Sequence, residues 1–253
     1  MRLSRTSIQN AVAGVALGTG LIASTTQAGL VYDLRFSDGS HTKNLSSADT
    51  YTVELWARVS GTNGTVTDEG MTNSYAQIGS TQTGGGGITS GGFTAGTLAD
   101  GFNEAGSRAG AANDWNADGI VDWGTTATAT ANTNYMLARN ATVGGVFGGG
   151  TLGQSVDAQT WEFKLATFTL NAAAIGTGTT SFNMVQPNMK AVAGAVTYAV
   201  SKVDNVTFNV SSANQQGAYT GSTGITLVGA IPEPSSIGLL GAAAVGLLGR
   251  RRK

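Results

Sequence analysis

The chain has 253 residues, of which 38 are glycine and only 11% are charged, and its formal net charge is −1. A charge so close to zero offers no basic surface to a nucleic acid, so that class of partner is excluded. The absence of cysteine excludes disulfides, thiolate metal sites and cysteine nucleophiles. Glycine disfavours helices whereas threonine and valine suit strands, so this composition predicts a mainly β protein.

Residues 1–28 have the features of an export signal. Arg2 and Arg5 precede an apolar stretch over residues 11–23, and the small residues that end at Ala28 resemble a signal-peptidase cleavage site. We therefore expect a signal peptide that forms a short helix, with the mature chain beginning directly after it.

Alternating apolar and polar residues predict three long strands, at residues 30–36, 50–59 and 160–170. The last of these carries apolar residues on both faces of its second half, which indicates a central strand. Shorter patterns predict strands at residues 73–80, 182–185, 195–200, 203–210 and 225–228, while residues 135–140 fit either a helical turn or the start of a strand. This series predicts a single antiparallel β-sandwich over residues 29–229.

Glycine-rich stretches interrupt these patterns. Residues 81–110 include four consecutive glycines at 84–87, and glycine also dominates residues 144–150. A run of glycine has no side chains to bury, so we expect residues 81–110 to form a flexible Gly-rich loop or a turn on the rim of the sandwich, and residues 144–150 to form another glycine-rich turn region.

The most distinctive internal pattern runs from residue 114 to residue 122. Oxygen-bearing side chains stand at its first, third, fifth and ninth positions, a glycine at the sixth allows a sharp turn, and the carbonyl of the seventh can add a ligand. Alternate side chains of a tight loop converge on one point, as Ca²⁺ coordination requires. The pattern resembles the start of a Ca²⁺ loop of the EF-hand or dockerin type, and the predicted ligands are Asp114, Asn116, Asp118, Ile120 and Asp122.

The pattern departs from the full loop at its twelfth position, where Thr125 stands instead of a bidentate acid, and its glycine- and alanine-rich flanks do not suit two helices. We therefore expect a single Ca²⁺ loop inserted in a β-domain near residues 114–125, or else an Asx-rich turn that satisfies only its own backbone. Trp115 and Trp123 beside the loop can pack under it or form an exposed surface that stacks on sugars.

Few residues suit catalysis. The chain has one histidine, His41, which we expect in a solvated turn, and it has neither a Gly-x-Ser-x-Gly elbow nor a His-Glu-x-x-His motif. Two carboxylates could still meet in space for glycosidic cleavage, and the candidates are Glu54, Asp68, Glu69, Glu104 and Glu162. We expect no enzymatic activity; the alternative is an extracellular carbohydrate-binding module or carbohydrate-active enzyme on a β-sandwich scaffold.

The C-terminal segment, residues 230–253, combines a stiff tripeptide, an apolar stretch and a basic tail. Pro232-Glu233-Pro234 is extended because each proline fixes its own φ and biases the residue before it. The stretch that follows predicts a transmembrane helix at about residues 236–249, which at roughly 20 Å is short for the ~30 Å core of a bilayer. The basic tail that would hold its end at the cytoplasmic side is Arg250, Arg251, Arg252 and Lys253.

This order of parts resembles the PEP-CTERM sorting signal of Gram-negative bacteria. The resemblance implies a transient anchor in the inner membrane, processing by an exosortase-type protease, and delivery to the cell surface or to an extracellular matrix or biofilm. It also implies a structural or adhesive role with exopolysaccharide or other surface proteins as partners. The sandwiches of such exported proteins are sometimes similar to cohesins, so a jelly-roll or cohesin-like form is expected for the domain.

Overall fold

The computed structural model describes residues 29–85, 87–124, 135–140, 152–185, 197–204, 206–211 and 219–229. The predicted signal peptide, the sorting signal with its helix at about 236–249, Thr125 and the glycine-rich residues 144–150 lie outside these ranges. Within them, no helix has the length and apolar character needed to cross a membrane.

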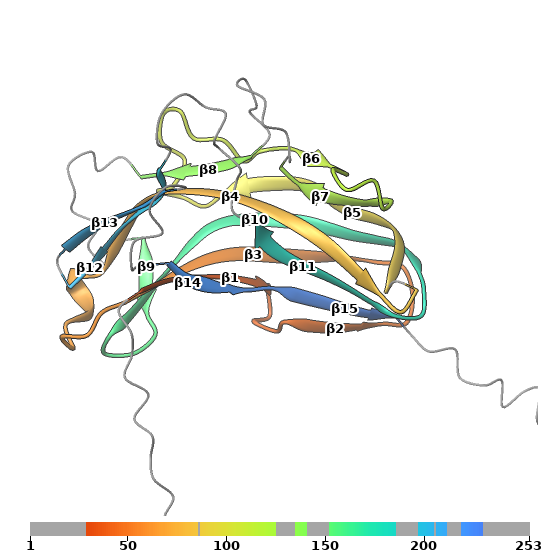
Figure 1. Cartoon of the computed structure of the whole chain (residues 1–253), viewed down its shortest axis with the longest axis horizontal. Helices are drawn as coiled ribbons and strands as arrows, with labels where there is room; N and C mark the ends of the chain where they lie inside the picture. The colour runs from red at the N-terminus through yellow and green to blue at the C-terminus, as the bar shows by residue number, and fades with distance from the viewer. Residues whose placement is uncertain are drawn as a thin grey trace, which may run out of the picture.

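The described residues form strands and one short 3-10 helix (Figure 1). The longest strands are β3 (Asp49–Ser60), β4 (Gly70–Thr83), β5 (Ile88–Leu98) and β10 (Thr160–Ile175). The others are β1 (Gly29–Phe36), β2 (Thr42–Leu45), β6 (Ala112–Asn113), β7 (Ile120–Trp123), β8 (Met136–Arg139), β9 (Gly153–Ser155), β11 (Thr179–Val185), β12 (Thr197–Val203), β13 (Val206–Ser211), β14 (Tyr219–Thr223) and β15 (Ile225–Gly229), and the 3-10 helix is η1 (Val66–Asp68).

The strands pair into one strongly curled sheet in the order β14-β1-β3-β10-β5-β7-β4-β11-β15-β2. The curl places β4 over β1, β3 and β10, so that the two halves of the sheet pack face to face (Figure 1). The Tyr32 hydroxyl of β1 reaches across to the Ser74 hydroxyl of β4, at 2.7 Å. The predicted mainly β sandwich is confirmed, although three of its pairings, β1–β14, β5–β7 and β15–β2, are parallel.

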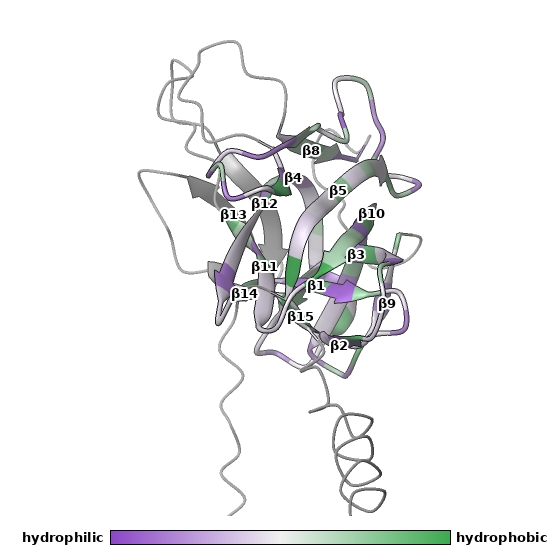
Figure 2. Ribbon diagram, turned by 90° about the vertical axis from the view of Figure 1, so that its right-hand side faces the viewer, coloured by the Kyte–Doolittle hydropathy of each residue, from purple (hydrophilic) through white to green (hydrophobic). Residues whose placement is uncertain are grey.

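An aromatic cluster joins the two halves at the core. The Phe93 ring of β5 lies 5.1 Å from that of Phe182 on β11 and 5.6 Å from that of Phe168 on β10. All three side chains are buried, and each makes the edge-on contact that aromatic quadrupoles favour. All the buried core residues except Phe102 and Tyr135 belong to the strands, where Figure 2 shows green hydrophobic segments of the ribbon.

A β-bulge explains the two apolar faces of the strand predicted at residues 160–170. Lys164 pairs with Trp56 and Ala166 with Leu55, which leaves Leu165 as an extra residue in β10. Because one inserted residue reverses the alternation, the side chains at 166, 168 and 170 point into the core together with that of Leu165. The predicted central position is also correct, since β10 lies between β3 and β5.

The prediction of a flexible loop at residues 81–110 is wrong for much of that range. Residues 88–98 form β5, which pairs with β10 along one side and with β7 along the other. Gly92 has φ +114°, and a Cβ there would overlap the carbonyl of Val121 on β7. Glycine therefore marks a close approach of two backbones here, where its abundance had indicated a loop. Residues 135–140, which fitted two structures, contain the strand β8.

Candidate functional site

The predicted Ca²⁺ loop connects β6 to β7, and its side chains fold back onto its own amides. The carboxylate of Asp114 accepts hydrogen bonds from the N–H groups of Asp118 (3.2 Å) and Gly119 (3.0 Å). That of Asp118 accepts from the N–H of Ile120 at 2.8 Å. Ala117 and Gly119 have positive φ, 55° and 88°, which produces the tight turn that the glycine at the sixth position indicated.

Ser80 of β4 attaches this loop to the sheet. Its N–H donates to Asp122 Oδ1 at 2.6 Å, and its hydroxyl lies 3.4 Å from Asp118 Oδ2. The Asn116 side-chain amide, which donates to Asp118 Oδ2 at 2.9 Å, lies 3.4 Å from the Ser80 carbonyl. Sequence reasoning missed Ser80, because it precedes the loop by more than thirty residues and approaches it only through the bridge between Ile78 and Trp123.

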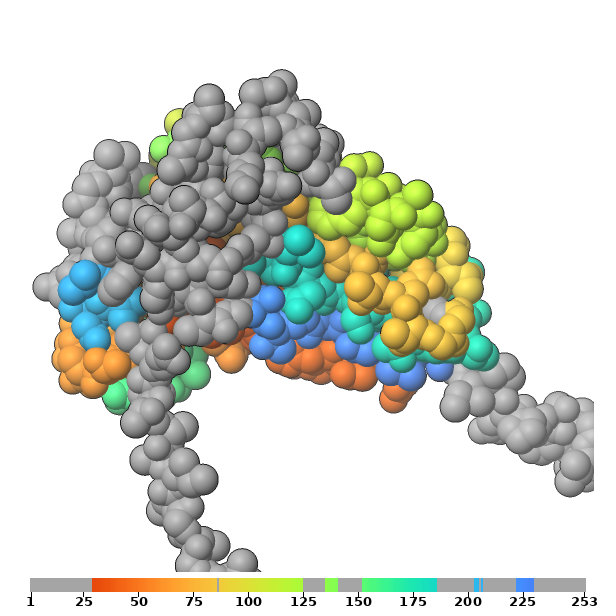
Figure 3. Space-filling view, in the orientation of Figure 1, coloured from red at the N-terminus to blue at the C-terminus, as the bar shows by residue number. Residues whose placement is uncertain are grey.

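The loop is open to solvent on one side and buried on the other. Residues 116–119 are exposed, and Figure 3 shows the yellow-green segment that contains them at the surface, beside the amber atoms of β4. Asp122 is fully buried, and its Oδ2 atom has no hydrogen-bond partner. Burial raises the pKa of Asp122 to about 6, and the nearby negative charge of Asp118 raises it further. Hydrogen bonds from Ser80 and from the backbone N–H of Trp115 oppose this rise.

The two tryptophans beside the loop do not form one exposed surface. Trp123 is 3% exposed, packs edge-on against Phe168 and donates from Nε1 to the Ala109 carbonyl at 2.7 Å. Trp115 is half-buried over β4, where a Cβ on Gly79 would come within 2.9 Å of its ring. The packing interpretation therefore holds for Trp123, and an exposed sugar-stacking pair is wrong.

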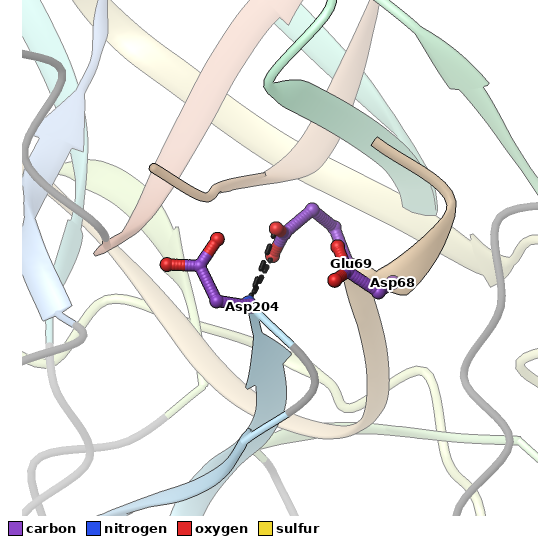
Figure 4. A group of neighbouring side chains, drawn as sticks. All are labelled: Asp68, Glu69 and Asp204. Atoms are coloured by element: carbon purple, nitrogen blue, oxygen red, sulfur yellow. Dashed lines mark hydrogen bonds between the residues drawn. The ribbon is translucent and has the colours of Figure 1, made fainter. Parts of the chain in front are cut away.

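A second acidic group lies at the other end of β4. Asp68, Glu69 and Asp204 bring their ligand atoms within 4.8 Å of one another, and no other group of three such side chains does so in the part of the chain that the structure describes (Figure 4). Glu69 is only 1% exposed and accepts from the backbone N–H of Asp204 at 3.2 Å. Asp204 lies in the turn between β12 and β13, and its carboxylate accepts from the N–H (2.7 Å) and hydroxyl (2.6 Å) of Thr62.

This acidic group is suited to holding a shared proton. Burial raises the pKa of Glu69 to about 7, the hydrogen bond from Asp204 opposes the change, and the charges of Asp68 and Asp204 add to it. The Oδ1 atom of Asp68 is buried and receives no hydrogen bond, whereas its Oδ2 accepts from Asn63 at 2.7 Å. A protonated Glu69 can donate a hydrogen bond to the side chain of Asp68, whose Oδ1 atom is the one without a donor. Two of the five acids considered for glycosidic cleavage, Asp68 and Glu69, belong to this group, and they are neighbours in sequence.

A network of charges on β1, β3 and β10 uses the remaining buried acids. Glu162 accepts hydrogen bonds from Arg35 and Arg58, each at 3.0 Å, and Asp33 forms ion pairs with both arginines at 3.3 Å. His41, expected in a solvated turn, lies in a bend before β2 with a 39% exposed side chain, and its Nε2 is 2.6 Å from Oδ1 of the buried Asp33. Each carboxylate in this network is paired with a cationic side chain, so none of the buried negative charges is left uncompensated.

The lowered pKa of Glu162 distinguishes this network from a catalytic acid–base pair, in which the general acid needs a raised pKa. Burial alone would raise the pKa of Glu162, but hydrogen bonds from Arg35, Gln154 and Arg58 hold the pKa below its usual value. Glu54, the other candidate acid on this face, pairs with Lys164 at 3.1 Å. Glu104 is exposed. These partners give the carboxylates a structural role in joining strands.

Comparison with known proteins gives information on the fold and on the C-terminal sorting signal. No curated protein matches the chain. Among solved structures, the chain is similar to the seventh ScaB type I cohesin from Pseudobacteroides cellulosolvens, with 11% identity and a TM-score of 0.41 over 82% of this chain and 96% of that chain. Residues 230–253 match the family model of the PEP-CTERM protein-sorting motif. The chain therefore carries a PEP-CTERM motif, which confirms the predicted sorting signal and supports export and C-terminal membrane anchoring.

Proposed function

We propose that this chain is a non-enzymatic structural or adhesive protein of the cell surface or extracellular matrix. The observation that carries the proposal is the sorting motif at residues 230–253, which implies exosortase-dependent sorting of an exported protein. The tail would anchor the protein in the inner membrane until an exosortase-type protease releases it. Exopolysaccharide or other surface proteins would be its partners.

The described domain is consistent with a structural role. Its buried acids are engaged with cations, with backbone amides or with one another, and its long strands are joined by hydrogen bonds and ion pairs between sequence-distant residues. A carbohydrate-binding module remains the alternative. The burial of Trp123 weakens it, because sugar stacking on this loop would then depend on Trp115 alone.

The sorting step has a direct test. Replacing Pro232-Glu233-Pro234 by three alanines should leave the protein in the membrane fraction at its unprocessed mass, because the extended motif that the protease would recognise is lost. Replacing Ser235 and Ser236 by alanine is the matched control, since it changes neighbouring residues and keeps the motif. Fractionation and mass spectrometry of the released protein give the readout. Unchanged release of the tripeptide variant would contradict the proposal.

The non-enzymatic role is tested on a panel of polysaccharides. We expect the protein to release no reducing ends from any of them, with or without Glu69→Gln. Binding without cleavage, lost in Trp115→Ala, would favour the carbohydrate-binding alternative. Release of reducing ends would contradict the proposed class.

A further inference from the structure

We propose that the loop between β6 and β7 binds one Ca²⁺ ion, and that this ion links the exposed loop to the buried end of β7 beneath β4. The ligands would be the side-chain oxygens and one carbonyl of the loop pattern, namely those of Asp114, Asn116, Asp118, Ile120 and Asp122. The site goes beyond the proposed surface role and does not depend on it.

The strongest support is Asp122, which lies on a strand and not in the turn. Its Oδ1 receives the Ser80 N–H, whereas its Oδ2 is inaccessible to solvent and has no hydrogen-bond partner. A buried carboxylate oxygen without a donor is unfavourable, and proteins compensate such an oxygen by protonation, with an ordered water or with a cation. The other oxygen-bearing residues of the loop pattern favour the cation here. The negative charge of Asp118 acts on the same carboxylate, so a cation placed near both acids would be attracted to each of them.

The ligand oxygens of Asp114, Asp118 and Asp122 do not all lie within 4.8 Å of one another. An ion would therefore have to draw these three carboxylates together, and the loop has the acceptor sites to bind it. The hydrogen bonds from Asp118, Gly119 and Ile120 occupy some lone pairs of the carboxylates, and each carboxylate has about four lone-pair sites. Ca²⁺ takes roughly six to eight oxygens in flexible geometry, so five protein ligands leave room for water from the exposed side. Mg²⁺ fits less well because it demands a near-ideal octahedron and dehydrates reluctantly.

Ser80 acts in this arrangement as a positioning residue. It contacts Asp122 through its N–H and Asp118 through its hydroxyl, so it fixes both acids against β4. The ion would therefore stabilise the loop, β7 and β4 as a unit. An Asx-rich turn that satisfied only its own backbone would require neither the contact with β4 nor a buried, unpartnered oxygen.

If the protein is exported as proposed, this site also ties its stability to the compartment. Single Ca²⁺ loops of extracellular modules bind with dissociation constants of about 10⁻⁴–10⁻³ M, well above the free Ca²⁺ of a cytoplasm. Asp122 would then stay uncompensated until the chain leaves the cell. Binding in the external medium would complete the fold after export.

Thermal unfolding of the full chain, after chelation and with added Ca²⁺ or Mg²⁺, tests the site. We expect about 10 mM Ca²⁺ to raise Tm by roughly 3–10 °C, and Mg²⁺ to raise it much less. Asp122→Asn and Asp118→Asn should abolish the rise. Asp157→Asn is the matched control, because Asp157 also accepts a backbone N–H in an exposed turn, at 2.7 Å from the Gln159 nitrogen, and it should keep the full response.

Terbium luminescence gives a second readout that does not depend on folding energy. Tb³⁺ replaces Ca²⁺ at oxygen sites, and Trp115 at the second position of the loop should sensitise it; Trp115→Phe should reduce the emission and leave the Ca²⁺-dependent rise of Tm in place. An unchanged Tm with Ca²⁺, or an equal rise in Asp118→Asn and in the control, would overturn the proposal. Neither result depends on how the chain is sorted, which the fractionation experiment measures separately.

Discussion

Among single residues, Glu69 makes the clearest link between burial and pH. Its pKa is raised from an ordinary 4.5 to about 7, so between these values the folded chain holds a proton that the unfolded chain has lost. The free energy of unfolding therefore falls as the pH rises through this window. A difference of this size corresponds to at most about 3 kcal/mol for a fully buried group.

The Glu69→Gln variant isolates this contribution. Glutamine keeps an acceptor for the Asp204 N–H and a donor for Asp68, so we expect stability equal to that of the unchanged chain near pH 5 and higher stability at pH 8. Urea unfolding at both pH values measures the difference. Taking the difference between the two proteins removes the contribution of Asp122, whose pKa is raised in the same direction.

Glu104→Gln is the control for this comparison, because Glu104 is exposed and its removal should leave the pH profile unchanged. A Glu69→Gln profile parallel to that of the unchanged chain would show that Glu69 does not hold a proton in the folded state.

At the scale of the element, β5 shows how glycine can build a strand. Gly92→Ala should be severely destabilising, by more than about 2 kcal/mol, because its φ of +114° strains any L side chain and its Cβ would overlap the Val121 carbonyl. Ser90→Ala on the same strand is the control, since Ser90 is exposed and makes no such approach. Chemical denaturation compares the two. Equal stability of both variants would mean that β5 and β7 do not pair as described.

The strands that could be predicted from the sequence are those whose alternation is undisturbed. In β3, Val53, Leu55, Ala57 and Val59 are completely buried and the residues between them are not, as the period of two indicated. β10 was predicted without its bulge, because an extra residue at Leu165 reads in sequence as two apolar faces. β5 was missed because glycine carries no periodicity, and only the positions of Val121 and Asn171 explain why Gly91 and Gly92 lack side chains.

The residues of the candidate sites also fall into two groups, those that could be predicted from the local sequence and those that could not. The turn at residues 114–119 follows from local chemistry, since the hydrogen bonds donated by the N–H groups of Asp118, Gly119 and Ile120 join residues no more than five positions apart. Ser80 and Asp204 could not be predicted, because they reach their partners through strand pairings between distant segments. The partners of Glu162 could not be predicted for the same reason, because the arginines that neutralise it lie on two other strands.

For the whole molecule, the hydrogen bonds of the first and last described strands define where the domain can be cut. β1 pairs with β3 over its full length, and β15 pairs with β11 and β2 up to Gly229. Both strands also contribute to the core, with Leu30 and Leu227 completely buried. The described pairings and buried side chains of these two strands therefore lie within residues 29–229.

A fragment of residues 29–229 should therefore fold alone and melt within about 2 °C of the full chain under the same conditions. A fragment of residues 29–224 is the matched control: it lacks β15, exposes the edge of β11 and removes the buried side chains of Ile225 and Leu227. Removing one buried aliphatic side chain lowers the free energy of unfolding by roughly 2–5 kcal/mol, so the shorter fragment, which lacks two, should lose cooperative unfolding altogether. Calorimetry on the three proteins decides the point. If the 29–229 fragment melted far below the full chain, the terminal segments would belong to the fold, and the sorting signal could not be removed without loss of the domain it delivers.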